Sequence, residues 1–483
     1  MLPRILESRG FAALLFFTTM VAGSPRSVAA DAPVPAAAPL PPTPATYRHL
    51  ADEVDGVLAK EILDKWFPAA VDNKGGGFIE NFGVNWTPAA NNPNRSIVYQ
   101  ARLTWLAANA AEHFPAKVAE YKELSRHGLT FLAEKQWDPQ QGGFYWSVTT
   151  AGAPSNDRPN EKHVYGNAFG IYAAAAEYKL THDPAALELA KKGFAWLEAH
   201  AHDAKNGGYI EALNVAGQPL TPTAPRGGRG GGAGSDAIGT PIGQKSMNTH
   251  IHLLEALTEL YQVWPDPLVR ARAQEIYDLA LKEIYTDPGY LTMFFTPEWQ
   301  KVPSRNGRGD SFGHNIEAAY LFTDAAAVLG RPNDEVAWKE ARKLVDHALQ
   351  YGYDKEHGGF FNEGTTTGGN LDTAKIWWVE AEGLYALLLM HERFGHETSV
   401  YWDTFLQQWK FISEHQLDHV NGGWYPSVVA DGSAPAGDGL RLKSNQWTEG
   451  YHEGRALINV ANKLRELADA GKLGAVPVTH GTR

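Results

Sequence analysis

The sequence contains no cysteine, which excludes disulfide bonds and any lipid anchor on a cysteine thiol. It also lacks a basic run, and its formal net charge is −12. A chain with that charge has no broad positive surface for nucleic acid. No Rossmann glycine fingerprint is present, so a nicotinamide cofactor is not expected either. We therefore expect a fold that rests on its hydrophobic core alone, with no cofactor and no nucleic-acid partner.

Long apolar runs are also missing, except for one near the N-terminus that is too short to span a membrane. Two arginines precede this run, which covers residues 11–23, and residues 28–30 (VAA) offer small side chains for cleavage. This order predicts a signal peptide over residues 1–30. The Pro/Ala-rich residues 31–46 predict a linker. We therefore expect an exported protein, periplasmic or extracellular, with no membrane contact after cleavage.

Aromatic residues, in contrast, are abundant. The 483 residues are 43% hydrophobic and 11% aromatic, with 15 Trp and 19 Tyr. That is enough apolar side chain for a large buried core. Most of the aromatic side chains are expected in this core, but clustered aromatic faces also suit sugar rings.

The chain is built from an internal repeat of about 65 residues. Its marker is the pattern Asp-x-x-x-Gly-Gly-aromatic. The five copies begin at Asp72, Asp138, Asp203, Asp354 and Asp418. A degenerate sixth copy around Asp287 lies in the long gap before Asp354. Because an Asp side chain holds turns and Gly adopts positive φ, these aspartates are interpreted as turn formers rather than catalytic groups.

A helix-like segment lies on each side of each turn, which predicts twelve helices. The expected ranges are 47–66, 95–113, 116–136, 162–180, 184–200, 247–263, 267–285, 312–330, 334–352, 373–394, 398–415 and 446–467. Six helical hairpins can form an open solenoid or a closed ring. We predict an all-α fold: one (α/α)6 barrel over residues 47–470, with short β-hairpins in the connecting loops and a tail over 471–483. The even-numbered helices are expected on the inside.

Polar and aromatic side chains that look misplaced in apolar helices occur only on the even-numbered helices, near their N-terminal ends. They are Arg102, Tyr165, Asn167, Asn248, His250, His252, Glu255, His314, Glu317, Trp377, Trp378, Glu380, Glu382, Trp447, Tyr451, His452 and Arg455. Like ends of alternate helices lie together in a closed ring, so these residues are expected to converge on one mouth of the barrel.

A single histidine on an apolar helix face is more often a hydrogen-bonded core residue than a functional one. Three of them on three inner helices, His252, His314 and His452, favour a functional site. The His-x-x-Glu spacing also occurs in helical metal sites. A metal is not expected here, because Arg102 and Arg455 would place positive charge beside the cation.

Four blocks of sequence are together similar to one known family. They are NTHIHLLEA (248–256), GHNIEAAYL (313–321), WWVEAE (377–382) and the pattern Trp-x-x-x-Tyr-His-x-x-Arg over 447–455. Over essentially all of residues 47–468 the chain resembles the N-acylglucosamine 2-epimerase superfamily, and most closely its cellobiose 2-epimerase branch. The resemblance implies an (α/α)6 barrel, an isomerase and a carbohydrate substrate. It leaves open whether the protein is a monomer or a homodimer.

The resemblance also implies roles for individual residues. Arg102 matches the arginine that stabilises the enolate oxygen, and His314 and His452 match the two histidines that exchange the C2 proton. His252 matches a third histidine that assists ring opening and orients the sugar, with Glu317 in support. The residues expected to contact or support the substrate are Tyr165, Asn248, Glu255, Trp378, Trp447 and Glu382.

Three features depart from the cellobiose branch. Asn315 stands where that branch usually has Asp, and residues 448–450 (TEG) stand where it favours Lys. The Gly-rich insert over residues 225–239 is foreign to compact members. Its glycines predict a disordered surface loop, and the alternative is a mobile flap over the barrel mouth.

The expected reaction is inversion at C2 of a glucose-ended sugar, either a cellobiose-like disaccharide or a monosaccharide. A histidine can remove the proton next to the carbonyl near neutral pH, and an arginine can stabilise the enediolate without titrating. An aldose–ketose isomerase would use the same bases and return the proton to C1. The third alternative is an inverting glycoside hydrolase, which would need two carboxylates from Glu255, Glu317 and Glu382 but not three histidines.

Overall fold

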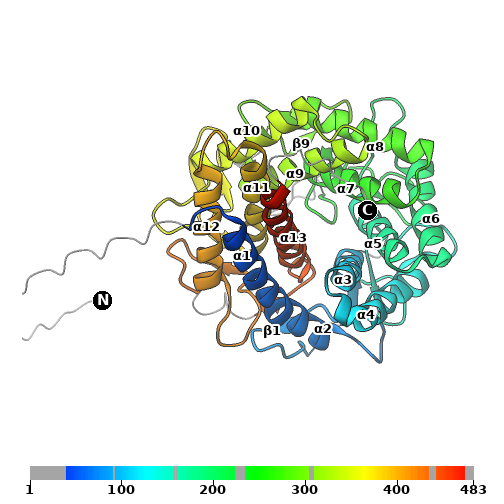
Figure 1. Cartoon of the computed structure of the whole chain (residues 1–483). Helices are drawn as coiled ribbons and strands as arrows, with labels where there is room; N and C mark the ends of the chain where they lie inside the picture. Colours follow the sequence, from blue (N-terminus) through cyan, green and yellow to red (C-terminus); the bar gives the residue numbers. More distant parts are fainter. Residues whose placement is uncertain are drawn as a thin grey trace, which may run out of the picture. The chain divides into compact units, whose positions relative to one another are not determined.

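Helices arranged in two concentric layers make up most of the structure (Figure 1). The computed structural model describes residues 40–90, 93–156, 158, 160–222, 234–303, 309–434 and 442–473. Residues 471–473 are described by their backbone only. The predicted signal peptide, residues 31–39 of the predicted linker, residues 225–233 of the Gly-rich insert and residues 474–483 of the tail lie outside these ranges. No helix of the described part is long and apolar enough to cross a membrane.

The inner layer consists of the even-numbered helices of the sequence prediction. They are α3 (Ile97–His113), α5 (Val164–Thr181), α7 (Met247–Val263), α9 (Phe312–Val328), α11 (Trp377–Phe394) and α13 (Tyr451–Leu473). Each packs against the next, and α13 packs back against α3. The ring is therefore closed, which confirms the predicted (α/α)6 barrel and excludes the open solenoid.

The outer layer covers the ring, one helical segment for each inner helix. Its helices are α1 (Pro44–Val57) with α2 (Asp64–Ala70), α4 (Val118–Phe131), α6 (Pro184–His200), α8 (Pro267–Leu279), α10 (Glu335–Tyr351) and α12 (Val400–Phe411). Short π-helical segments join α1 to α2 and end α4, α8 and α12; they are η1 (Leu58–Leu63), η3 (Leu132–Gln136), η4 (Ala280–Ile284) and η5 (Ile412–Gln416). A 3-10 turn, η2 (Pro115–Lys117), precedes α4.

Three helix starts differ from the sequence prediction by more than two residues, and one of them is that of α11, which begins at Trp377 instead of residue 373. The helix α1 begins at Pro44, inside the predicted linker, because Thr43 accepts a hydrogen bond from the Thr46 N–H and Pro44 suits the first helical position. The last inner helix begins at Tyr451, five residues later than expected. A turn at Asn445 precedes it, and Trp447 therefore lies in the approach to α13 rather than on the helix.

Short antiparallel strands connect neighbouring units around one end of the barrel. They are β1 (Phe82–Gly83), β2 (Asn94–Ser96), β3 (Ser147–Thr149), β4 (Lys162–His163), β5 (Ala212–Leu213), β6 (Lys245–Ser246), β7 (Tyr285–Thr286), β8 (Tyr290–Leu291), β9 (Phe294–Phe295), β10 (Lys301–Val302), β11 (Asp310–Ser311), β12 (Glu363–Gly364), β13 (Asn370–Asp372), β14 (Lys375–Ile376), β15 (Ser427–Val428) and β16 (Leu442–Ser444). The strand before each inner helix pairs with a strand of the next unit, as β2 does with β3, and β16 pairs with β1. The strand pairs thus link each unit to the next and the last unit to the first, so they close the ring in addition to the helix contacts.

The repeated Asp-Gly-Gly segments are turns, as predicted. In the second copy, Asp138 Oδ1 accepts the backbone N–H groups of Gln140 and Gln141, while its Oδ2 contacts Lys162 Nζ at 2.8 Å. Gly142 and Gly143 adopt φ values of 69° and 74°, which glycine reaches without strain. All five regular copies place a cation against the aspartate; the cations are Arg95, Lys162, Lys245, Lys375 and Lys443.

Candidate active site

One polar side chain on each of five inner helices faces outward and holds a turn. These side chains are Gln100, Asn167, His250, Asn315 and Glu380, and they accept the backbone N–H groups of Phe78, Phe144, Tyr209, Leu291 and Phe360. Burial lowers the pKa of His250 to about 3, which keeps it a neutral acceptor. The expectation that Asn167, His250 and Glu380 converge on the barrel mouth was therefore wrong. Asn315, which stands where the cellobiose branch usually has Asp, also holds a turn and does not line the cavity described below.

The residue two positions after each of these anchors faces the barrel axis, because two residues of an α-helix differ by roughly 200° around it. These inward residues are Arg102, Phe169, His252, Glu317 and Glu382. The repeat thus brings a histidine, an arginine and two glutamates to one level of the barrel.

Three of these side chains, Arg102, His252 and Glu317, line a cavity of about 210 Å³ at the end of the barrel where the inner helices begin. It is lined by Arg102, Tyr165, Ile238, Asn248, His252, His314, Glu317, Trp377, Trp378, Trp447 and His452. Nine of the eleven predicted site residues are in this set. The other two, Glu255 and Glu382, lie behind histidines instead of facing the cavity.

Two of the three histidines are oriented by a buried carboxylate. His452 Nδ1 lies 2.6 Å from Glu382 Oε1, and His252 Nδ1 lies 2.9 Å from Glu255 Oε2. A carboxylate only accepts, so each imidazole donates from Nδ1 and keeps the lone pair of Nε2. Burial lowers the pKa of His452 well below its usual value, so its imidazole is neutral and can act as a base.

His314 is oriented differently, by a hydroxyl and an indole. Its Nδ1 lies 2.6 Å from Ser311 Oγ, which can donate or accept, so either tautomer has a partner. Its ring centroid lies 4.8 Å from that of Trp378. Gly313 makes room for this contact, since a Cβ atom there would lie 2.4 Å from the indole. Burial lowers the pKa of His314 to about 4.

Arg455 connects the groups behind the cavity, a role that the sequence did not reveal. Its guanidinium donates to Glu255, to Glu317 Oε1 at 2.5 Å and to Glu382 Oε1 at 2.6 Å. Although burial favours protonation, Arg455 and His252 lower the pKa of Glu255. The Glu317, Glu382 and His452 ligand atoms lie close enough to bind a metal ion, but the Arg455 cation already occupies both carboxylates.

Arg102 is held rigidly at the cavity wall. It donates to Glu449 Oε1 at 3.0 Å and to Tyr165 Oη at 3.1 Å, and its guanidinium carbon lies 4.4 Å from the Phe169 ring centroid. Burial raises the pKa of Glu449 to about 7. Glu449 belongs to the TEG segment that departs from the cellobiose branch, and this departure was the only sequence signal for it.

Several buried polar atoms at the cavity have no hydrogen-bond partner among the described residues. They are Glu317 Oε2, Asn248 Oδ1, Arg102 Nε and Trp377 Nε1. An unpaired buried polar group is costly and rare in folded proteins. Two acceptors and two donors at a wall that contains three indoles match a polyhydroxylated ligand with an apolar ring face.

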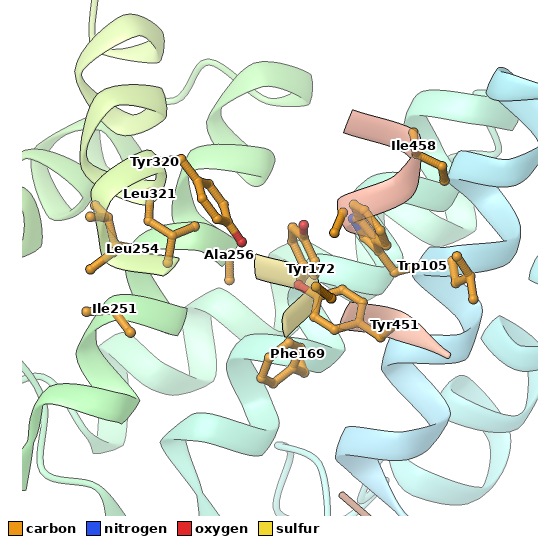
Figure 2. Packing of buried hydrophobic residues seen from close by; sticks show 14 of the residues in the cluster. Trp105, Phe169, Tyr172, Ile251, Leu254, Ala256, Tyr320, Leu321, Tyr451 and Ile458 are labelled. Atoms are coloured by element: carbon orange, nitrogen blue, oxygen red, sulfur yellow. The ribbon is translucent and has the colours of Figure 1, made fainter. Parts of the chain in front are cut away.

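A larger cavity, of about 570 Å³, opens deeper along the barrel axis, but no histidine lines it in the described part of the chain. Glu255, Tyr320 and Arg455 form part of its wall. Figure 2 shows Trp105, Tyr172 and Tyr451 packed together. The smaller cavity is the candidate active site because the candidate proton-transfer groups line it.

Comparisons with known proteins agree with this fold. The sequence profile of the N-acylglucosamine 2-epimerase (GlcNAc 2-epimerase) family matches residues 77–225 and 235–446. A cellobiose 2-epimerase from Bacteroides fragilis is 30% identical over 418 residues, which cover 85% of this chain and 98% of that protein. A D-mannose isomerase from Marinomonas mediterranea is 26% identical over 74% of this chain and 85% of its own length. The solved cellobiose 2-epimerase from Bacillus thermoamylovorans has a TM-score of 0.74 at 26% identity, covering 86% of this chain and 99% of that one. The chain therefore belongs to the N-acylglucosamine 2-epimerase family.

Proposed function

We propose that this protein is a carbohydrate 2-epimerase that inverts C2 of a glucose-ended sugar, with a cellobiose-like disaccharide as the preferred substrate. The observation that carries the proposal is the meeting of His314, His452 and Arg102 at one cavity. The similarity to cellobiose 2-epimerases over most of the chain supports a sugar substrate and this reaction class.

The reaction begins on the open-chain aldose, whose C2–H is acidified by the neighbouring carbonyl. The Nε2 atom of one histidine takes the C2 proton, and the electron pair moves onto the carbonyl oxygen to give an enediolate. The second histidine donates a proton from Nε2 to the other face of C2; for His314 this is the tautomer whose Nδ1 accepts from Ser311 Oγ. His314 and His452 are the two bases, on α9 and α13. His252 assists ring opening through its cavity-facing Nε2.

Arg102 stabilises the enediolate oxygen. Tyr165 and Glu449 fix its guanidinium by accepting its hydrogen bonds. Burial opposes the charge, but these two partners raise the pKa of Arg102 above its usual value. The cation is thus present at every pH at which the protein is folded, and no reorganisation is needed when negative charge develops on the substrate.

An aldose–ketose isomerase is the second candidate, because a D-mannose isomerase is also similar to this chain. It would use the same bases but return the proton to C1. A glycoside hydrolase is disfavoured, because Glu255, Glu317 and Glu382 all bind the Arg455 guanidinium. All three carboxylates are thus paired with a cation, whereas an inverting hydrolase requires one of its two carboxyl groups as a free general acid.

The test is NMR of cellobiose, glucose and mannose incubated with the protein in heavy water. An epimerase gives the C2 epimer with deuterium at C2, whereas an isomerase gives a ketose with deuterium at C1. Free glucose from cellobiose without deuterium at carbon indicates a hydrolase. No change in any of the three sugars contradicts the proposal.

On the N-terminal sequence pattern alone, we also propose export by a signal peptide that is cleaved after residue 30. N-terminal sequencing of the mature protein from the producing cells tests this. A first residue at Asp31 is expected, and an intact N-terminus in the cell extract contradicts it.

A further inference from the structure

The chain returns from the Gly-rich insert to α7 through a short hairpin over residues 234–242. Asp236 N–H donates to the Thr240 carbonyl at 2.9 Å, and Ile242 N–H donates to the Gly234 carbonyl at 3.0 Å. The Asp236 carboxylate closes the hairpin from inside, because its Oδ1 accepts the N–H groups of Ile238 and Thr240 at 3.1 and 2.8 Å. The segment is thus an ordered element at the barrel mouth.

The hairpin is held on the start of α5 by buried polar contacts. His163 Nε2 lies 2.9 Å from Asp236 Oδ2, and both side chains are buried. His163 caps α5 by accepting the Tyr165 N–H at Nδ1, so its proton is on Nε2 and is donated to Asp236. Glu161 Oε1 accepts the Ala237 N–H at 2.7 Å. The residues at the start of α5, which position Tyr165 at the cavity, therefore also bind the hairpin.

The ligand atoms of His163, Asp236 and Glu211 also lie close enough together to bind a metal ion, but each is already in use. The Glu211 carboxylate accepts hydrogen bonds from Ser246 and from Thr249 Oγ1. Both imidazole nitrogens of His163 are engaged, as described above. The cluster is a hydrogen-bonded joint between α5, the hairpin and the start of α7.

This joint presents Ile238 to the catalytic cavity. Among the described residues that line the cavity, Ile238 has the only aliphatic side chain. It cannot transfer a proton or donate to a hydroxyl, so its contribution to a bound sugar is apolar contact. The hairpin sits at the barrel mouth between the starts of α5 and α7, whereas His314 and His452 are on α9 and α13.

We propose that Ile238 is a specificity-determining residue that contacts the sugar unit next to the reacting one, and that Asp236 and His163 are the positioning residues that hold it there. This inference rests on the proposed function. It predicts that Ile238 favours a disaccharide over a monosaccharide.

The first test compares Ile238→Ala with the matched change Ile242→Ala, which lies in the same hairpin but not in the cavity wall. The expected result for Ile238→Ala is a KM for cellobiose that rises roughly tenfold, the effect of removing one or two methylene contacts in a pocket. The kcat on cellobiose and the KM for mannose change less than about twofold. Ile238→Val should restore most of the affinity. Equal effects on the two sugars, or the same effect from Ile242→Ala, overturn the proposal.

The second test addresses Asp236. Asp236→Asn keeps an oxygen acceptor inside the hairpin but removes the charge that faces His163. A positioning role predicts a raised KM for cellobiose with kcat unchanged, and no additional rise when Ile238→Ala is combined with it. A merely structural role would lower kcat with both sugars, and additive effects in the double variant also contradict the proposal.

Deuterium exchange separates a failure of this inference from a failure of the proposed function. If the wild-type protein exchanges C2–H of cellobiose and Ile238→Ala leaves KM unchanged for both sugars, the inference is wrong and the epimerase stands. If the wild-type protein exchanges no carbon-bound hydrogen, the proposed function is wrong and the inference falls with it.

Discussion

His452 and Glu382 are joined side chain to side chain across two neighbouring inner helices, with 2.6 Å between Nδ1 and Oε1. The same carboxylate accepts from Arg455 at Oε1 and from the Tyr320 hydroxyl at Oε2, both at 2.6 Å. The glutamate is thus fixed from three sides. It transmits that rigidity to the imidazole and holds its tautomer, so Nε2 is the atom that faces the cavity.

The first prediction concerns this contact. Glu382→Gln keeps the volume but removes the charge that selects the Nδ1–H tautomer of His452. We expect kcat for C2 epimerisation to fall roughly 10²- to 10⁴-fold, as when an orienting carboxylate is neutralised beside a catalytic histidine. The exposed change Glu414→Gln serves as control. A kcat within twofold of wild type would show that Glu382 does not orient the base.

The second prediction separates the two bases. His314→Asn and His452→Asn should each reduce net epimerisation by at least about 10²-fold. Because each histidine serves one face of C2, each variant should still exchange C2–H of one epimer with heavy water, and the two variants should prefer opposite epimers. The exposed His396→Asn is the control. Loss of exchange with both epimers in one variant would point to a single base for both faces.

The third prediction is the pH dependence. Burial lowers the pKa of His314 to about 4, so this base is neutral at every pH above that value. The acid limb of kcat/KM should therefore lie well below pH 6.5 and approach pH 4. An acid limb centred at 6.5 in a full pH–rate profile would indicate that His314 does not act as the base.

The same shift affects stability. An unfolded histidine protonates near pH 6.5, so between about 6.5 and 4 the unfolded state binds more protons at this position than the folded state does. The free energy of unfolding should consequently fall as pH falls through this window. Urea titrations at several pH values should show a weaker dependence for His314→Asn than for wild type. An unchanged dependence would contradict the lowered pKa.

The fourth prediction concerns Arg455. Arg455→Met leaves three buried carboxylates without their shared cation, and uncompensated buried charge costs about 3–5 kcal/mol of unfolding free energy. Urea unfolding measures this, and the exposed Arg126→Met should show no change. A variant as stable as wild type would mean that the carboxylates are protonated in the folded protein, which the lowered pKa of Glu255 argues against.

The fifth prediction compares the lysine–aspartate pair of one regular repeat unit with that of the degenerate sixth unit. Lys162 is fully buried against Asp138, whereas in the degenerate sixth unit Lys343 pairs with the exposed Asp287. Lys162→Met should cost about 3–5 kcal/mol because the buried aspartate loses its partner. Lys343→Met should cost far less, since solvent screens that pair. Equal losses in urea unfolding would contradict the assigned difference in burial.

The sequence by itself determined the six-unit barrel and most of the cavity wall. Helical periodicity and the recurrent Asp-Gly-Gly turns depend on neighbouring residues, so the chain order shows them directly. His252, His314, His452 and Arg102 were found because they recur near the starts of alternate helices, where a closed ring must bring them together.

Only the tertiary structure decided which polar side chains face inward. His250 and His252 are alike in sequence, but the first anchors a turn and the second reaches the cavity, because the docked turn fixes the rotation of α7. Arg455 joins carboxylates from three other helices, and Ile238 enters the cavity from a hairpin docked on α5. Such contacts join segments that are distant in the chain, and they depend on how the helices pack. A local sequence pattern therefore cannot predict them.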